Sequence, residues 1–448
     1  MFPRVAISCL FTALLLPAAA RTRPRYGGAI RVEVAGDPLA GPGGLARRLI
    51  FDGLTAFGPD GSVQPALAIA WRADDRDHRW EFTLRPGVSF QDGSPVTAAA
   101  VVESLNRSCN GDCPWSAVHA VGVSLIFTGG SPMPQLPAVL AGDEFPIGLT
   151  IGANGLPPAN PTGTGPFQFV SNSNGAVMLA ANQNCWQGRP FADSIEIRGH
   201  RGVREQWLDL SVDRADVVEV PPEMLREAHQ QQLNLVTSPS VTLLALQLAS
   251  AGALANPKLR ASIAEAVDRG ALFNVIFQKQ GELTAALLPQ QLTGYAFLFP
   301  ADRKLSKAIA LRGGLSPAPL KLDVKGDSAM QLAAQRIALN LHDAGFQVQV
   351  VSGDTPNPDL SLRKLPLAGR DPAAALSILL RGAGMSDPVA GQSPTALYRA
   401  EKEILDSHVI VPLLDLPRAW AVGAHVRDFA LRADGTPDLA DASLEGAP

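Results

Sequence analysis

The chain lacks any marked excess of charge of one sign. Its 448 residues hold 38 Lys and Arg against 42 Asp and Glu, which gives a formal net charge of -4. Proteins that bind nucleic acids through the phosphate backbone carry a basic excess or a basic stripe. The charge balance therefore predicts that nucleic acid is not a partner.

The sequence also lacks the short motifs of common catalytic and metal-binding sites. No Gly-x-Ser-x-Gly motif occurs, and none of the 7 His belongs to a His-x-x-x-His pair or a Cys/His cluster. The adjacent acids Asp74 and Asp75 lie in a polar stretch, where solvated carboxylates are expected. We therefore predict no enzyme activity, no cofactor and no metal site. An exported hydrolase is the weakest alternative, because catalytic groups can be assembled by folding alone.

Long apolar runs are absent after the first twenty residues. Arg4 is followed by the apolar run Val5–Leu16 and by Pro17–Ala20, which ends in small residues. This is the pattern of a secretory signal peptide, and we expect cleavage after Ala20. The run is shorter than the roughly 20 residues that a membrane-spanning helix needs. We therefore expect an exported, periplasmic protein.

Cysteine is scarce, and Cys9 belongs to the expected signal peptide. Cys109 and Cys113 flank the turn-forming residues Asn110–Asp112. In an oxidising compartment we expect these two to form a disulfide, with a metal or redox pair as the alternative. Cys185 is expected to be a buried thiol.

Hydrophobic residues and turn formers, by contrast, are plentiful. The chain is 46% hydrophobic and 18% charged, as in folded proteins, and 448 residues are too many for one core. Alternation in Trp80–Leu84 predicts a strand, and Leu259, Ile263 and Val267 predict one face of a helix. A strand at Lys321–Val324, a helix at Ser328–Ala344 and a strand at Gln347–Val351 predict a βαβ unit. Further strands are expected at Val121–Phe127, Val241–Ala249 and Val409–Leu414.

One long segment, Leu49–Asn106, carries an ordered set of sequence signals. It contains Gly53-Leu54, Asp60-Gly61, Pro65–Ala68 and Trp71, then Phe82–Val88, Phe90, Asp92-Gly93, Pro95 and Thr97-Ala98. In this order the residues resemble family 5 of the extracellular solute-binding proteins, the peptide and nickel class that serves ABC importers. Later segments extend the resemblance from Tyr26 to about Phe429: Pro161–Phe167, Asn182 with Trp186, Lys258–Arg269 and Val411–Leu413.

The resemblance implies an α/β fold of the bilobal periplasmic binding protein type (type II-like), with an additional domain inserted in the first lobe. It places the first lobe at 26–48, 160–240 and 412–448, the inserted domain at 49–159 and the second lobe at 241–411. It implies a small peptide-like or other polar ligand, permease subunits as partners and a monomer. A receptor or sensor module of the same fold without a transport role is the alternative.

The ligand-binding residues are expected to differ from those of peptide-binding members. These usually carry an Asp for the ligand ammonium shortly before a pair that matches Asp371-Pro372, and here Ala368 takes its place. Candidate ligand-binding residues are Asp37, Gln247, Arg370 and Trp420, with loop or packing roles as the alternative for each. The pair Asp268-Arg269 is expected to be structural.

Overall fold

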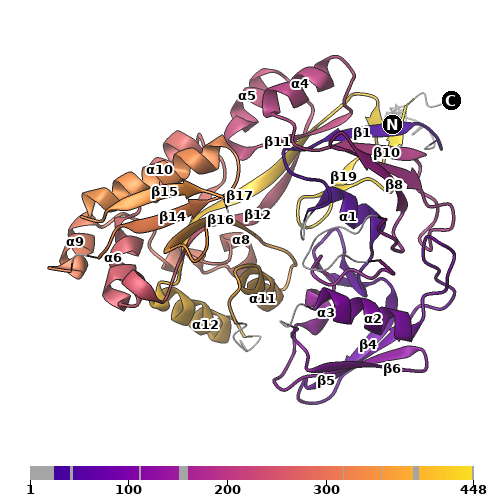
Figure 1. Ribbon diagram of the computed structural model, residues 1–448, viewed down its shortest axis with the longest axis horizontal. Coiled ribbons are helices and arrows are strands. Elements are labelled where there is room, and N and C mark those ends of the chain that lie inside the picture. Colours follow the sequence, from indigo (N-terminus) through magenta and orange to yellow (C-terminus); the bar gives the residue numbers. More distant parts are fainter. Residues whose placement is uncertain are drawn as a thin grey trace, which may run out of the picture.

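One long, twisted sheet runs through both lobes of the protein in the computed structural model, which describes residues 25–40, 44–109, 113–150, 160–315, 317–353, 355–386 and 393–445 (Figure 1). Its strand order is β15-β14-β16-β12-β17-β11-β1-β10-β9-β8, and β13 also pairs with β17. The strands are β1 (Ala29–Glu33), β8 (Phe167–Ser173), β9 (Ala176–Ala181), β10 (Ser194–Arg198), β11 (Val217–Val220), β12 (Leu235–Leu248), β13 (Glu282–Leu283), β14 (Leu320–Val324), β15 (Val348–Ser352), β16 (Leu360–Pro366) and β17 (Ile410–Val422).

The two long strands β12 and β17 connect the lobes. They pair antiparallel from Leu235 opposite Ala421 to Gln247 opposite Ile410, with three shifts of register. The sequence predicts both strands too short, because Pro and Ser interrupt the apolar pattern and proline cannot donate to a strand ladder. The register shifts accommodate these residues. As a result, β17 contributes Val411 to the second-lobe core and Trp420 to the first-lobe core.

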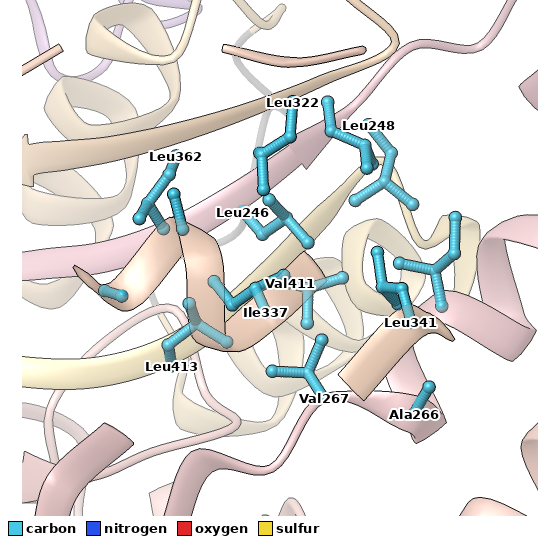
Figure 2. Close-up of a cluster of buried hydrophobic side chains, with 14 of the residues drawn as sticks. Leu246, Leu248, Ala266, Val267, Leu322, Ile337, Leu341, Leu362, Val411 and Leu413 are labelled. Carbon is cyan, nitrogen blue, oxygen red and sulfur yellow. The ribbon is translucent and has the colours of Figure 1, made fainter. Parts of the chain in front are cut away.

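Helices cover both faces of the second-lobe sheet (Figure 1). They are α6 (Pro257–Ala266), α7 (Arg269–Ala271), η4 (Leu272–Ile276), α8 (Gln290–Thr293), η5 (Ala296–Leu298), α9 (Leu305–Arg312), α10 (Ser328–Asp343), α11 (Pro372–Gly382) and α12 (Pro394–Ser407), with η3 (Gly252–Leu254) before them. The predicted βαβ unit is confirmed, since β14 and β15 are parallel and α10 lies between them in the chain. Figure 2 shows α10 packing Ile337 and Leu341 against leucines and valines of the sheet.

The pair Asp268-Arg269 has the structural role that the sequence predicts. Asp268 Oδ1 accepts a hydrogen bond from the backbone N–H of Ala271 at 2.9 Å and so caps α7. Arg269 is buried, and its Nε donates to the carbonyl of Pro412 at 2.8 Å. The pair therefore fixes the α6–α7 junction against β17.

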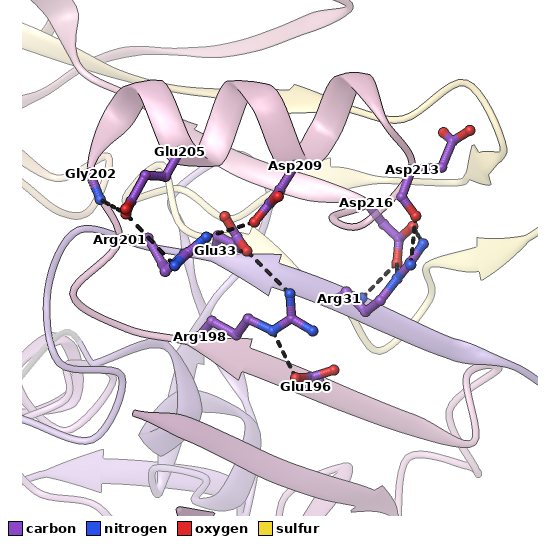
Figure 3. Close-up of polar contacts among 10 residues, drawn as sticks. All are labelled: Arg31, Glu33, Glu196, Arg198, Arg201, Gly202, Glu205, Asp209, Asp213 and Asp216. Carbon is purple, nitrogen blue, oxygen red and sulfur yellow. Dashed lines mark hydrogen bonds and ion pairs between the residues drawn. The ribbon is translucent and has the colours of Figure 1, made fainter. Parts of the chain in front are cut away.

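In the first lobe, ion pairs with buried carboxylates join β1 to β10 and to the segments on either side of α4 (Val203–Ser211). Arg31 on β1 forms an ion pair of 2.6 Å with the buried Asp216 (Figure 3). Burial opposes ionisation of Asp216, but hydrogen bonds with Arg31 and His425 and the charge of Arg31 together outweigh it and lower the pKa of Asp216. Glu33 is fully buried between Arg198 and Arg201, at 3.4 and 3.6 Å. The remaining first-lobe elements are α1 (Leu45–Ile50), η2 (Pro222–Met224), α5 (Leu225–Gln230), β18 (Val426–Arg427), β19 (Ala430–Leu431), β20 (Pro437–Asp438) and β21 (Ser443–Leu444).

The inserted domain has its own sheet and core. Its strands are ordered β4-β5-β7-β6, and a separate β2–β3 hairpin precedes them. The elements are β2 (Thr55–Phe57), β3 (Val63–Pro65), β4 (Ala68–Ala73), β5 (Arg79–Leu84), β6 (Ala117–Val121), β7 (Ser124–Thr128), α2 (Ala98–Ser108) and α3 (Leu136–Val139). The strand expected at Val121–Phe127 is instead a hairpin, because Gly122 turns the chain at φ 59°. A glycine between two valines does not interrupt the apolar pattern, so the pattern did not predict a turn at Gly122.

Local signals at the ends of α2 are confirmed. Thr97 caps the helix by accepting a hydrogen bond from Ala100 N at 3.2 Å. Cys109 and Cys113 form the expected disulfide just beyond it, and Cys185 is a buried free thiol. The signal peptide lies outside the described residues. Within the described ranges, no helix is both long and apolar enough to cross a membrane.

Candidate functional site

A cavity of about 1040 Å³, here called the cleft cavity, lies between the two lobes. It is lined by residues that are far apart in the sequence. These are Ala35, Gly36, Arg48, Val139, Gly142–Glu144, Gly202–Glu205, Glu219–Met224, Val241, Thr242, Asp327, Ser328, Arg363–Pro366, Ala368, Ile378, Arg381, Gly382, Leu416–Ala419 and Asp434. Both lobes, both connecting strands and the inserted domain therefore contribute to its wall.

The cleft cavity lies at the carboxyl ends of parallel strands from each lobe. In the first lobe β1 is parallel to β10 and β11, and the residues after β1 and β11 line the wall. In the second lobe β14 is parallel to β15 and β16, and residues in the segments after β14 and β16 also line the wall of the cavity. Open α/β sheets bind ligands at this end of their strands. The carboxyl ends of the parallel strands of both lobes therefore face the cleft cavity.

Contacts across the cleft join the second lobe to the inserted domain. Arg381 on α11 forms an ion pair with Glu144, with 3.0 Å between Nε and Oε2. The backbone N–H of Arg370 donates to the carbonyl of Gly61 at 2.8 Å. The side chain of Arg370 reaches Asp60 at 3.5 Å, where both groups are exposed. These contacts hold the lobes together on one side of the cavity.

The wall of the cleft cavity carries charges of both signs in nearly equal number. Seven carboxylate side chains and six Lys or Arg side chains line it. Some are paired with each other: Lys364 lies 3.0 Å from Asp327, and Arg418 lies 4.0 Å from Glu219. The cavity is therefore suited to a polar ligand and not to a purely apolar one.

Comparison with known protein families identifies the fold. The profile described as "Bacterial extracellular solute-binding proteins, family 5 Middle" matches residues 62–396. The chain belongs to this family. The resemblance seen in the sequence and the bilobal α/β fold are thereby confirmed.

Individual relatives support the same family. The chain is 29% identical over 269 residues to the probable D,D-dipeptide-binding periplasmic protein DdpA of Escherichia coli, covering 55% of this chain and 52% of DdpA. The alignment thus spans about half the length of that relative.

Two solved structures share the fold with TM-scores of 0.78. One is NikA from Staphylococcus aureus in complex with Ni(L-His)2, at 17% identity and covering 93% of this chain and all of NikA. The other is AgaA from A. tumefaciens R10 in complex with agropinic acid, at 21% identity and covering 90% and 95% of the two chains.

The structure of this family 5 protein places the sequence candidates at different sites. Ala368 lines the cleft cavity; this is the position at which peptide-binding members are expected to carry an ammonium-binding Asp. Arg370 lies outside the lining and instead bridges to the inserted domain. Asp37 is exposed after β1, where its Oδ1 accepts a hydrogen bond from Leu39 N at 2.9 Å. Only its neighbours Ala35 and Gly36 reach the cavity.

The other two candidates have packing contacts. Gln247 joins the sheet to the end of α11, since its Nε2 donates to the carbonyl of Ala383 at 2.7 Å. Trp420 is 2% exposed in the first-lobe core, and its Nε1 donates to Gly435 O at 3.0 Å. Neither side chain is part of the cavity lining. A role of these residues in binding ligand stays a prediction.

Glu223 is a wall residue that the sequence did not identify. It lies on η2, and its Oε2 atom is buried without a hydrogen-bond partner. Burial raises the pKa of Glu223, and the nearby charge of Asp327 raises it further. Glu223 belongs to the first lobe and Asp327 to the second, so no local pattern could bring them together. Within the described part of the chain, no group of three or more His, Cys, Asp or Glu is arranged to hold a metal ion.

We predict that Glu223→Gln raises stability only at higher pH. Below the unfolded-state pKa, near 4.5, Glu223 is protonated in both states and the substitution changes little. As the pH rises above 4.5, the unfolded chain loses this proton more readily than the folded one, so the wild type loses stability. We expect equal melting temperatures at pH 4 and a variant a few degrees higher at pH 8. Glu227→Gln, at an exposed position of α5, is the matched control; a gain of equal size there would contradict the prediction.

Proposed function

We propose that the protein is the substrate-binding component of an ABC importer, which encloses a small polar ligand between its lobes and delivers it to a membrane permease. The observation that carries this proposal is the cleft cavity, a space of about 1040 Å³ at the strand ends of two lobes. Its volume is at the upper end of the range for small-molecule sites. A ligand that touches both lobes favours the closed state, because it binds that state better.

The charges of the wall support a ligand with both cationic and anionic groups. The buried Oε2 of Glu223 has no partner and could accept a hydrogen bond from a ligand amine. Ala368 supplies no carboxylate at the position that peptide-binding members use. A dipeptide, named in DdpA, and agropinic acid, bound in AgaA, are both small and polar. We propose a ligand of this class, peptide-like or another small polar solute.

The same proposal includes location and partners. The family is extracellular, and the name of DdpA describes a periplasmic protein. We propose that this chain is exported by its N-terminal signal peptide and acts in the periplasm as a monomer. Its partners would be the inner-membrane permease subunits, and its role would be binding without catalysis.

Thermal unfolding in the presence of a ligand panel tests the proposal. A bound ligand stabilises the folded state by RT ln(1 + [L]/Kd), so a true ligand at 100 times its Kd contributes about 2.7 kcal/mol. We expect one class among dipeptides, opines, nickel chelates and sugars to raise the melting temperature. Ala368→Trp, which places a bulky side chain on the wall of the cavity, should reduce this rise.

A control variant and a contradicting outcome complete the ligand test. Val123→Trp lies at a 68% exposed position of the β6–β7 turn and should respond to ligand as the wild type does. If no panel member shifts the wild type, and mass spectrometry finds no co-purified ligand, the proposed function is wrong. Steady turnover of a panel member would instead indicate a hydrolase.

A further inference from the structure

A second, smaller cavity adjoins the cleft cavity and is built around three arginines. It has a volume of about 110 Å³ and lies between the first lobe and the inserted domain. Arg47, Arg48 and Arg432 line it, and we call it the arginine pocket. It shares four wall residues with the cleft cavity: Arg48, Gly142, Asp143 and Asp434. The two spaces therefore meet at one wall.

All three guanidinium groups have a buried N–H group with no hydrogen-bond partner. The atoms are Nη1 of Arg47 and the Nε atoms of Arg48 and Arg432. Arg47 is the extreme case, since it is 8% exposed and forms no ion pair with any described residue. Its guanidinium lies over the ring of Phe51, with 5.8 Å between Cζ and the ring centroid. Burying a charged group without a hydrogen-bond acceptor is costly, and Nη1 of Arg47 has no acceptor.

The carboxylates of the pocket do not supply that acceptor. Asp143 and Asp434 both form ion pairs with Arg48, and Asp143 acts on Arg47 only through its charge, without an ion pair. Asp52 is occupied by two donors, Trp186 Nε1 at 2.9 Å and Thr164 Oγ1 at 2.8 Å. Burial raises the pKa of both Asp52 and Asp143, and the charge of Arg48 opposes this shift at Asp143. The pocket is thus rich in donors relative to acceptors.

We propose that the arginine pocket binds a small anion of carboxylate size, held by Arg47 with help from Arg48 and Arg432. The planar fork of a guanidinium matches the two oxygens of a carboxylate, and such charge-assisted bonds are among the strongest in proteins. A volume of about 110 Å³ admits a group of a few heavy atoms and excludes a whole peptide. The anion is either the carboxylate of a ligand in the cleft cavity, which rests on the proposed function, or a free small anion.

The free-anion arm is a titration of the whole protein with sodium acetate and inorganic phosphate. Ionic strength is held constant with a bulky sulfonate salt that the pocket cannot admit, and melting temperature is followed. If a free anion binds, acetate or phosphate gives a saturable rise that Arg47→Met abolishes. This arm needs no transported ligand, so it succeeds or fails independently of the proposed function.

The ligand arm compares the free acid and the amide of whichever ligand the panel identifies. If its carboxylate occupies the arginine pocket, the acid binds the wild type at least tenfold more tightly than the amide. Arg47→Met should remove that preference and leave the affinity for the amide unchanged. Arg72→Met, at a 79% exposed side chain in the inserted domain, is the matched control and should preserve every difference.

A further variant guards against loss of folding. If Arg47→Met is not folded, Arg47→Lys retains the charge but loses the fork, and should weaken the same response at least threefold. The inference is overturned if acetate and phosphate give no saturable rise and acid and amide bind equally. It is overturned equally if these responses persist unchanged in the Arg47 variants.

Discussion

Replacing Phe82 by Ala is expected to lower the free energy of unfolding by about 3–5 kcal/mol, the usual range for a buried Phe. Phe82 is fully buried at the centre of the inserted domain. Its ring lies 5.3 Å from that of Phe127, edge to face, and about 6 Å from Trp71 and Trp80. The substitution removes all three contacts and leaves a cavity that the surrounding strands can fill only in part.

Urea denaturation followed by tryptophan fluorescence measures this loss. Four of the six tryptophans lie in or against the core of the inserted domain, so the signal reports mainly on that domain. Val123→Ala, at an exposed position of the β6–β7 turn, should change the stability by no more than about 0.5 kcal/mol. A loss below about 1 kcal/mol for Phe82→Ala would contradict the burial described above.

The same variant tests how the domains divide their roles. Phe82 supports the wall of the cleft but is not part of its lining. A folded Phe82→Ala protein should therefore keep the ligand preference of the wild type. A changed order of ligand affinities would show that the inserted domain core selects the ligand.

Sequence patterns predicted the parts of this fold that local periodicity encodes. The alternation in β5, the apolar face of α10 and the cap of α2 at Thr97 each involve residues within a few positions of one another. The hairpin at Gly122 was missed, because glycine between two valines keeps the apolar run intact. The lengths of β12 and β17 were missed because their continuation depends on pairing with each other across the lobes.

The cleft was harder to predict than the fold, for a physical reason. Its wall consists of strand ends and helix starts from separate segments, so Glu223 and Asp327 meet only in the folded protein. Charged and small residues at such positions resemble ordinary loop residues in the sequence. Ala368 was placed correctly at the wall only because the family resemblance supplied its position. Trp420 and Gln247 were chosen by residue type; Trp420 packs in the first-lobe core and Gln247 forms a hydrogen bond to the end of α11, and their role in ligand binding stays a prediction.

Glu401 shows the same limit, because the sequence presents it as one polar residue among many on α12. In the structure it is fully buried, and its Oε1 accepts hydrogen bonds from Leu287 N at 2.5 Å and Leu288 N at 3.2 Å. We expect Glu401→Ala to lower the free energy of unfolding by roughly 2–5 kcal/mol, because two buried N–H groups lose their acceptor. Urea denaturation measures the loss, and Glu403→Ala, at an exposed position of the same helix, should leave the stability nearly unchanged.

Glu401→Gln separates the hydrogen bonds from the charge. The amide oxygen can accept from the same two N–H groups, so this variant should retain most of the stability that Glu401→Ala loses. Burial raises the pKa of Glu401, so the folded wild type holds this proton to higher pH than the unfolded chain does. The wild type should therefore lose stability relative to Glu401→Gln as the pH rises above about 4.5, and the two should converge below it. If the amide variant is as unstable as the Ala variant at every pH, the charge of Glu401 and not its acceptor role stabilises the second lobe.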